Sequence, residues 1–591
     1  MVVQSEVECA SDVAQLWAQL TDTEYLNRAI GQGPRAIVPI DNQGAARYRV
    51  RARAGGFPLE WEERPFEWVR HKSYRVERRM VAGPIRMIDT LFRFAPGAAG
   101  GATVTVRLEL EPRNWFYGLV VPAGARRTLQ QIVDAVGRID RAIQAGLPAP
   151  AEPGVVALDA LERAREALGK LAPPALADRL AKHVREARDD ELQRIRPFEL
   201  ADLWQVDRRA LLGTCLHAVR AGLLEMRWEV VCPSCRTGTD SLPTLSALAD
   251  HGECHLCDIE FKLDVDESVE ATFMPTPGVR KLDAGQYCVG GPARTPHVVA
   301  QSVLPAHGQA VLQAPDEAGR YRLFVRGGAT VPVELVDGAP AELEVAEETM
   351  AEGKLAIAPG GRLIVRSSSD AERHCKLERA QFPQNAATAR EVTALPGFRR
   401  DFSAEVLRPE LTLKVSRVAL FFSDLTASTQ LYSNVGDAAA LRLVQDHFEV
   451  VTRLIEEHGG TLVKTIGDAV MAVFADDLDG LRASLALLGA FEVFLKGHPD
   501  RAQTHIKLGL YSGPSYLVTA NGVLDYFGQT VNIAARLQAQ AQSGELVVEA
   551  SLADQAIARG GLRPAQVKER YSATLKGVDQ PIAVARITFA G

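Results

Sequence analysis

The chain has 591 residues, too many for one hydrophobic core, and its length predicts roughly four domains. Hydrophobic residues make up 47% and charged residues 24%, as is ordinary for globular protein, and the net charge of -7 favours neither a nucleic-acid nor an anionic-membrane partner. Because the sequence holds no signal segment and no apolar run of about 18 residues, we expect a cytoplasmic, multidomain α+β protein without membrane insertion.

Residues 1–147 alternate short strands with turns and end in one long helix. The predicted helix spans residues 124–145, and apolar side chains recur on one of its faces at a helical period: Leu129, Ile132, Val133, Val136, Ile139 and Ile143. One antiparallel sheet gripping a C-terminal helix explains this order of elements. With the Pro65-Phe66-Glu67-Trp68 turn, the order resembles START-like helix-grip domains, and the resemblance implies a cavity for an apolar ligand. A core filled by side chains is the alternative.

Residues 146–154 are rich in Pro and Ala, which predicts a linker. Helical segments over residues 155–225 precede a strand that begins at Met226, an order that fits either a winged helix or a plain helical spacer. Three arginines are too few to form a basic recognition face: Arg208, Arg209 and Arg220. We therefore expect a spacer, and nucleic acid is not an expected partner.

Two Cys-x-x-Cys pairs within residues 226–275 have the spacing of a zinc site. Eighteen residues separate Cys232 and Cys235 from Cys254 and Cys257, and each pair lies where a strand meets a tight turn. Four thiolates on paired knuckles predict a closed, structural Zn²⁺ site in a zinc ribbon. A redox dithiol is the alternative, although no βαβ pattern surrounds either pair. The other four cysteines are predicted to be small buried hydrophobic side chains: Cys9, Cys215, Cys288 and Cys375.

Residues 280–400 contain short strand-like runs separated by Gly- and Pro-rich turns. Short strands at regular spacing predict a small β-sandwich-like domain. No set of residues with catalytic spacing occurs in this region, so we assign no chemistry to it.

From residue 412 to residue 591 the pattern changes to strands that alternate with long helices. Two segments each carry one carboxylate that packing does not explain. Asp424 ends the apolar run Val418–Phe422, and Asp468 lies in a tight turn between two strand-like runs. A buried, unpaired charge is costly, so these carboxylates require partners. Two hard oxygen ligands in one pocket suit Mg²⁺ or Mn²⁺ and a polyphosphate substrate.

Four segments of this region, taken in order, are similar to the motifs of class III nucleotide cyclase catalytic domains. They are Phe422–Thr426, Lys464–Asp468, Asp525–Arg536 and Lys576-Gly577. The resemblance covers residues 415–590 and implies an α/β domain with a ferredoxin-like core. The zinc-ribbon and β-rich residues upstream resemble an uncharacterised region found next to such domains.

The resemblance assigns roles in catalysis to single residues. Asp424 and Asp468 would hold two Mg²⁺ or Mn²⁺ ions, with the Leu425 carbonyl as a further ligand, while the 3′-hydroxyl of ATP attacks the α-phosphorus. Asn532 would orient the ribose, and Arg536 would bear charge on the transferring phosphorus. Their spacing of four places both side chains on one helix face.

Three further residues would bind the nucleotide. Lys464 can donate to adenine N1, and Asp525 can accept from the exocyclic amine, whereas guanine presents the opposite pattern. A buried mismatch costs about 1–3 kcal/mol per group, so the pair predicts a preference for ATP. The resemblance assigns to Lys576 the role of binding the triphosphate.

In class III cyclases the metal-binding and base-binding residues of one site come from different subunits. The resemblance therefore implies a head-to-tail homodimer and an inactive monomer, with Lys464 and Asp468 serving opposite sites. We expect an adenylate cyclase that forms 3′,5′-cyclic AMP and pyrophosphate and is regulated by its upstream modules. The alternative is a catalytically silent sensor or adaptor that binds an apolar ligand or nucleic acid through those modules. The intact pair of aspartates argues against a silent domain.

Overall fold

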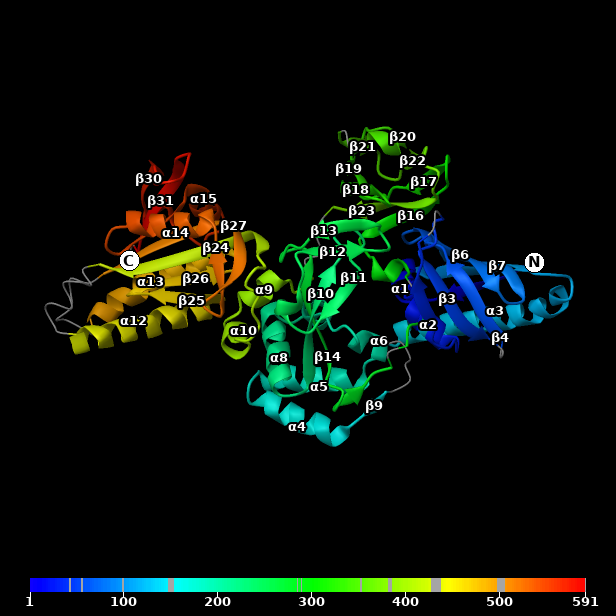
Figure 1. Ribbon diagram of the computed structural model, residues 1–591, viewed down its shortest axis with the longest axis horizontal. Helices are drawn as coiled ribbons and strands as arrows, with labels where there is room; N and C mark the ends of the chain where they lie inside the picture. The colour runs from blue at the N-terminus through cyan, green and yellow to red at the C-terminus, as the bar shows by residue number, and fades with distance from the viewer. Residues whose placement is uncertain are drawn as a thin grey trace.

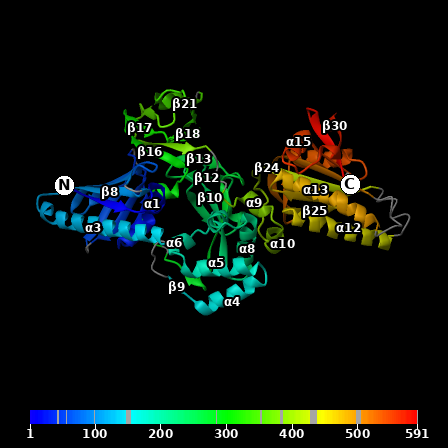
Figure 2. The ribbon, with the colours of Figure 1, turned by 180° about the vertical axis from the view of Figure 1, so that it is seen from behind.

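The computed structural model describes residues 1–41, 44–54, 57–97, 100–146, 154–283, 285–288, 290–350, 353–380, 385–426, 437–496 and 505–589. Figures 1 and 2 show an elongated molecule in which the N-terminal sheet and the C-terminal α/β domain occupy opposite ends. None of the helices in the described ranges combines the length and the hydropathy that a membrane span requires.

The N-terminal region is an antiparallel sheet that holds one long helix. Its elements are β1 (Val2–Cys9), α1 (Val13–Leu20), α2 (Thr23–Ala29), β2 (Ala36–Pro39), β3 (Tyr48–Ala54), β4 (Phe57–Glu63), β5 (Glu67–Val69), β6 (Ser73–Ala82), β7 (Ile85–Pro96), β8 (Ala102–Pro112) and α3 (Tyr117–Gln144). The core between sheet and helix is filled by aromatic rings, with Tyr74 stacked on Phe92 at 4.6 Å and Trp17 against Phe94 at 5.3 Å. These rings therefore pack against one another in this part of the core.

Helix α3 begins at Tyr117, earlier than the predicted start at residue 124. The Asn114 side chain accepts a hydrogen bond from the Tyr117 backbone N–H at 3.1 Å, which satisfies one free donor of the first turn. Pro122 lies inside the helix, where it removes one backbone hydrogen bond but has a φ value that a helix tolerates. The proline therefore does not mark the boundary that the sequence pattern indicated.

The N-terminal sheet continues directly into residues 298–379. Strand β5 pairs with β16 (Val298–Leu304), and the path goes on through β23 (Arg373–Arg379), β18 (Gly319–Val325), β19 (Ala329–Leu335) and β21 (Leu355–Ile357) to form a 13-stranded sheet. A separate sheet, β17 (Gln309–Gln313), β22 (Arg362–Arg366) and β20 (Glu342–Ala346), shares a hydrophobic core with the second part of this sheet. Residues far apart in sequence thus form one continuous sheet (Figure 1).

Helices precede the region with the paired cysteines. They are α4 (Leu158–Gly169), α5 (Pro174–Glu186), α6 (Asp189–Leu192), α7 (Pro197–Trp204) and α8 (Arg208–Arg220). The following strands are β10 (Leu224–Val231), β11 (Gly238–Leu242) and β14 (Val269–Pro275) in one sheet, β12 (His251–Cys254) with β13 (Ile259–Lys262), and β9 (Val155–Val156) with β15 (Arg280–Lys281). Short 3₁₀ helices lie at Leu245–Ala247, Pro292–Arg294, Glu347–Thr349 and Pro564–Gln566.

The three arginines considered for a recognition face form ion pairs within the chain. Arg208 pairs with Asp202 at 2.7 Å, Arg209 with Asp479 at 2.6 Å and Arg220 with Asp401 at 2.9 Å. The last two pairs tie the helical segment to residues of the C-terminal part of the chain.

The C-terminal domain is a sheet of order β25-β26-β24-β27-β29-β31-β30, with β28 paired to β27. Its elements are α9 (Ala389–Thr393), α10 (Pro396–Asp401), β24 (Leu413–Leu425), α12 (Asp437–Glu457), β25 (Gly460–Ile466), β26 (Ala469–Phe474), α13 (Asp477–Lys496), β27 (Ile506–Ala520), β28 (Val523–Phe527), α14 (Gln529–Gln540), β29 (Glu545–Glu549), α15 (Ala550–Ala558), β30 (Val567–Ala573) and β31 (Ile582–Thr588). One face packs against α12, α13 and α15. The other face shares a core with α14 and with the upstream helices.

Candidate active site

The two aspartates lie at the same edge of the C-terminal sheet. In central strand β24 the run Val418–Phe422 is apolar and buried on both faces, and Asp424 is the last residue but one of the strand. Ser423 pairs with Val470 on β26, so Asp424 and the preceding turn of β26, which carries Asp468, lie at the same end of neighbouring strands. Gly467 has a φ of 65° in this turn, a conformation that glycine adopts without strain.

The donor atoms at this edge fit a divalent cation. The Asp468 Oδ2 atom is buried and has no hydrogen-bond partner among the described residues, so it retains an open acceptor. Asp424 Oδ2 lies 3.4 Å from the Lys507 ammonium, and Leu425 follows it in the same strand. Hard carboxylate oxygens are the ligands that Mg²⁺ and Mn²⁺ prefer. These residues are therefore suitable for the metal ions that the sequence implies.

A buried histidine lies close to Asp468. His447 on α12 is fully buried, and burial lowers its pKa to about 4, while the nearby charge of Asp468 acts in the opposite direction. Because its pKa is low, His447 is neutral near pH 7. It adds no positive charge that would compete with a cation for Asp468.

Lys464 and Asp525 are brought together from separate strands. Lys464 Nζ lies 2.5 Å from Asp525 Oδ2, and Asp525 Oδ1 accepts a hydrogen bond from the Tyr526 N–H at 2.8 Å. The Asp525 side chain is 11% exposed, whereas that of Lys464 is 40% exposed. The pair thus has a fixed acceptor and a donor that can still reach solvent.

Strand β28, which carries Asp525, was not expected as a separate element. Strand β27 extends from Ile506 to Ala520, and β28 folds back on it through a turn at Asn521-Gly522, where φ is 53° and 76°. An Asn-Gly pair between apolar runs is a strong hairpin signal, so this turn could have been found from the sequence.

Helix α14 carries the residues predicted to contact the ribose and the transferring phosphorus. Asn532 is exposed and Arg536 is half-buried on this helix. The helix approaches the sheet closely over Gly509, where an added Cβ would lie 2.3 Å from the Gln538 backbone nitrogen. The Arg536 guanidinium lies against Gly577, 3.6 Å from where a Cβ would be, and Lys576 next to it is exposed. The loop that carries Lys576 and Gly577 therefore lies against helix α14, although the two are far apart in sequence.

The residues fall into two groups within one chain. One group, which we call the carboxylate edge, is Asp424 and Asp468. The other, which we call the α14 group, is the predicted base-binding pair Lys464 and Asp525 together with helix α14. Among the described residues no hydrogen bond or ion pair joins Asp424 or Asp468 to Asn532 or Arg536. Next to these groups several apolar side chains are exposed: Ile466, Tyr516, Val523 and Phe527, the last at 70%.

The upstream segment also touches the strand of Asp525, through a residue that the sequence did not indicate. Arg399 on α10 donates to the Leu524 carbonyl at 2.7 Å, and its guanidinium lies 5.5 Å from the centre of the Tyr526 ring. The Ala394 carbonyl accepts from the Thr461 hydroxyl on β25. No local pattern marks an arginine that supports a strand more than a hundred residues away, so only the fold shows it.

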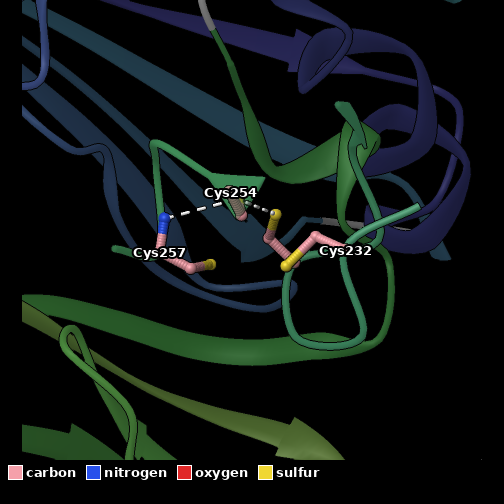
Figure 3. Close-up of side chains that lie close together, drawn as sticks. Cys232, Cys254 and Cys257 are labelled. Atoms are coloured by element: carbon pink, nitrogen blue, oxygen red, sulfur yellow. Dashed lines mark hydrogen bonds between the residues drawn. The ribbon is translucent and has the colours of Figure 1, made fainter. Parts of the chain in front are cut away.

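The four predicted zinc ligands lie together. The sulfur atoms of Cys232, Cys235, Cys254 and Cys257 are all within 4.8 Å of one another, and all four side chains are buried. Figure 3 shows three of them, Cys232, Cys254 and Cys257, close together. The fully buried Lys376 on β23 places Nζ 3.5 Å from the Cys257 sulfur. An ammonium here would offset the negative charge that four thiolates leave on a Zn²⁺ centre, so the cluster fits that ion.

The remaining cysteines are buried as predicted, and they take no part in the cluster. Burial raises the pKa of Cys215 and of Cys375 to about 12 and that of Cys9 to about 11. These thiols are protonated and unreactive at neutral pH.

A small cavity lies at the junction of the N-terminal sheet, the cysteine knuckles and β16. Its volume is about 60 Å³, and Phe66, Trp68 and Val298 contribute apolar walls while Arg47 and Lys376 contribute charge.

Comparison with protein families finds three matching segments. Residues 412–581 match the adenylate and guanylate cyclase catalytic domain, residues 9–136 match the polyketide cyclase / dehydrase and lipid transport family, and residues 159–288 match a family of unknown function. The match at residues 9–136 agrees with the START-like prediction.

Curated relatives match about a quarter of this chain. An uncharacterised Mycobacterium tuberculosis protein, Rv2212, is 34% identical over 168 residues, which are 27% of this chain and 38% of that protein. An adenylate cyclase of Streptomyces coelicolor is 33% identical over 141 residues, 24% of this chain and 34% of that protein. Guanylate cyclase 2G of Mus musculus is 28% identical over 173 residues, 27% of this chain and 15% of that protein. The chain thus spans well under half the length of these relatives.

Among solved structures, the adenylyl cyclase CyaB from P. aeruginosa is 19% identical with a TM-score of 0.27, covering 31% of this chain and 97% of that chain. An adenylate/guanylate cyclase/hydrolase from Silicibacter pomeroyi is 22% identical with a TM-score of 0.27, covering 30% of this chain and 99% of that chain.

Proposed function

We propose that this chain, which carries an adenylate and guanylate cyclase catalytic domain and a START-like domain, converts ATP into 3′,5′-cyclic AMP and pyrophosphate. The observation that carries the proposal is the meeting of Asp424 and Asp468 at one sheet edge, with a carboxylate oxygen on Asp468 that has no hydrogen-bond partner among the described residues. Such an acceptor beside a second carboxylate suits a bound cation.

The reaction forms one bond and breaks another on the same phosphorus. The 3′-hydroxyl loses its proton to water, its oxygen bonds to the α-phosphorus, the bond from that phosphorus to the bridging oxygen breaks, and pyrophosphate leaves with the electron pair. Asp424 and Asp468, with the Leu425 carbonyl, would hold two Mg²⁺ or Mn²⁺ ions, which when bound acidify the 3′-hydroxyl and neutralise the leaving phosphates.

The residues of α14 and the loop beside it act on the other parts of the nucleotide. Asn532 orients the ribose, and Arg536 places a guanidinium on the transferring phosphoryl group, where charge develops. Lys576, exposed beside Arg536, neutralises the triphosphate. None of these three side chains has to transfer a proton during the reaction.

The choice of ATP rests on the Lys464 and Asp525 pair. In the free protein the two side chains satisfy each other, so a purine must replace that ion pair with its own donor and acceptor. Adenine offers an acceptor at N1 to the ammonium and a donor at the amine to the carboxylate. Guanine offers a donor and an acceptor in the reverse order, which leaves two buried groups unpaired.

A homodimer completes the site in this proposal. Within one chain no hydrogen bond or ion pair between described residues links the carboxylate edge to the α14 group, and apolar side chains beside them are exposed, as at Phe527. A second copy docked head to tail would cover this apolar surface and bring its α14 group to the carboxylate edge of the first.

The test measures the products of the full chain with ATP or GTP in the presence of Mn²⁺, by mass spectrometry. We expect cyclic AMP from ATP and its loss by at least about a thousandfold in Asp468→Ala, because a metal ligand is removed. Asp554→Ala is the matched control, since Asp554 is an exposed carboxylate of the same domain and forms a surface ion pair with Arg570 at 2.7 Å. Wild-type protein that forms no cyclic nucleotide from either substrate would exclude the proposal and favour the silent sensor.

A further inference from the structure

Four large apolar side chains protrude from the start of helix α3. Trp115 is 80% exposed, Phe116 55%, Leu119 72% and Val120 60%. We call these four residues the apolar tip. The N-terminal domain that carries them lies at the end of the molecule opposite the C-terminal domain (Figures 1 and 2). Exposed apolar side chains gathered at one site indicate an interaction surface.

The apolar tip is held in a defined shape. The Arg113 side chain donates to the carbonyls of Gly83 at 3.0 Å and Met80 at 2.9 Å, which ties the segment to the turn between β6 and β7. Asn114 caps the first turn of α3, and the Trp115 and Phe116 rings meet edge to face at 6.2 Å. The fold therefore displays these side chains on a fixed support.

Arginines flank the apolar tip on the same side of the helix. At about 100° per residue, Phe116, Leu119 and Val120 lie on the outer face of α3, and Arg126 and Arg127 follow on that face roughly 12 Å along the axis. Both arginines are exposed, and within the described ranges neither has an ion-pair partner. No acidic residue occurs between Arg113 and Asp134, although the exposed Glu111 lies just before this segment.

We propose that the apolar tip docks on a membrane surface that contains anionic lipids. Trp and Phe side chains favour the boundary between headgroups and acyl chains, and arginines beside them bind lipid phosphates. An interfacial helix buries its apolar face only about 5–10 Å deep, which the first turns of α3 can do without unfolding.

The charge distribution favours anionic lipid as the occupant. The whole chain has a net charge of -7, but residues 113–133 carry three arginines and no acid. The net charge of the whole chain therefore does not reveal that this segment is basic. A tip that projects from the end of the domain also suits a flat surface, and docking there leaves the distant C-terminal domain in solution. The inference does not depend on the proposed enzyme activity.

Flotation of the full-length protein with vesicles tests the proposal. We expect binding to vesicles of equal parts phosphatidylcholine and phosphatidylglycerol, and at least about tenfold weaker binding to phosphatidylcholine alone. The double variants Trp115→Ser/Phe116→Ser and Arg126→Glu/Arg127→Glu should each lose at least about tenfold in binding to the mixed vesicles. Leu203→Ser is the control, because Leu203 is 75% exposed on α7, away from the tip.

Thermal unfolding of each variant checks that it is folded. Binding of Trp115→Ser/Phe116→Ser at the wild-type level would overturn the proposal, as would equal binding to both kinds of vesicle. A variant that leaves vesicle binding unchanged but turns a dimer into a monomer in light scattering would assign the tip to a second copy of the chain, which also overturns it.

Discussion

The side chains of Lys464 and Asp525 lie on different strands and neutralise each other, so the base selection proposed for them rests on two residues that can each be exchanged. Guanine presents its donor and its acceptor in the reverse order, which a glutamate at position 464 and a serine at position 525 would match. We expect Lys464→Glu/Asp525→Ser to shift the ratio of kcat/KM for ATP over GTP towards GTP by one to two decades, since each mismatch costs about 1–3 kcal/mol. The measurement is that ratio, obtained with the two nucleotides at equal metal concentration.

Two controls separate specificity from stability in this exchange. The double variant should keep its thermal midpoint, because an exposed donor is replaced together with its acceptor. Arg453→Ala removes another exposed ion pair of the domain, with Glu457 at 3.2 Å, and should leave the ratio unchanged. A double variant that slows both substrates equally would show that the pair supports the fold and does not select the base.

At the scale of elements, helix α10 supports the strand that carries Asp525. Arg399→Ala removes the hydrogen bond to the Leu524 carbonyl. We expect it to raise KM for ATP several-fold and to lower the free energy of unfolding by about 1.5–3 kcal/mol, as for loss of a charged hydrogen bond. Arg400→Ala, next in sequence but exposed and paired with Asp401, should change neither value by much.

The opposite outcome for Arg399→Ala would change the role of α10. If the variant cyclises ATP faster than wild type, the contact restrains the domain, and the upstream region inhibits it. If KM is unchanged while stability falls, the contact is structural and does not position Asp525.

The cysteine cluster joins two elements of different sheets, since Lys376 of β23 reaches the Cys257 sulfur. We expect the purified chain to hold Zn²⁺, and Cys254→Ser to lose it and to unfold at a lower temperature, because the metal closes the ribbon. Zinc content by mass spectrometry and thermal unfolding are the measurements. Cys215→Ala is the control, as this buried thiol lies on α8 outside the cluster. Full zinc content in Cys254→Ser would contradict the assignment.

At the scale of the whole molecule, local patterns predicted much more than long-range pairing. The strand before Asp424 and the spacing of Asn532 and Arg536 are visible as apolar runs and helical periods, and the family match at residues 412–581 agrees with that interpretation. The pairing of Val69 with Ala300 leaves no periodic signal, because the partners are more than two hundred residues apart. The hydrogen bond from Arg399 to the Leu524 carbonyl could not be predicted for the same reason.

The continuous sheet has a consequence for the stability of the upstream regions. Deleting residues 1–146 would leave the β16 edge unpaired and would remove the Glu24 carboxylate, which accepts from the Tyr287 and Cys288 N–H groups at 2.9 Å each. We therefore expect the shortened chain to unfold at a lower temperature and to aggregate, as an open sheet edge favours. Thermal unfolding and light scattering measure this. Equal stability of the two chains would show that the N-terminal domain is an independent unit.

The central claim is that each site combines the carboxylate edge of one chain with the α14 group of another, and mixing two inactive variants tests it most directly. Asp468→Ala and Arg536→Ala should each be inactive with ATP. Equal amounts should together recover about a quarter of the wild-type rate, because half of the dimers are mixed and each mixed dimer has one intact site. A mixture as inactive as its parts, although light scattering shows that both variants dimerise, would contradict the account.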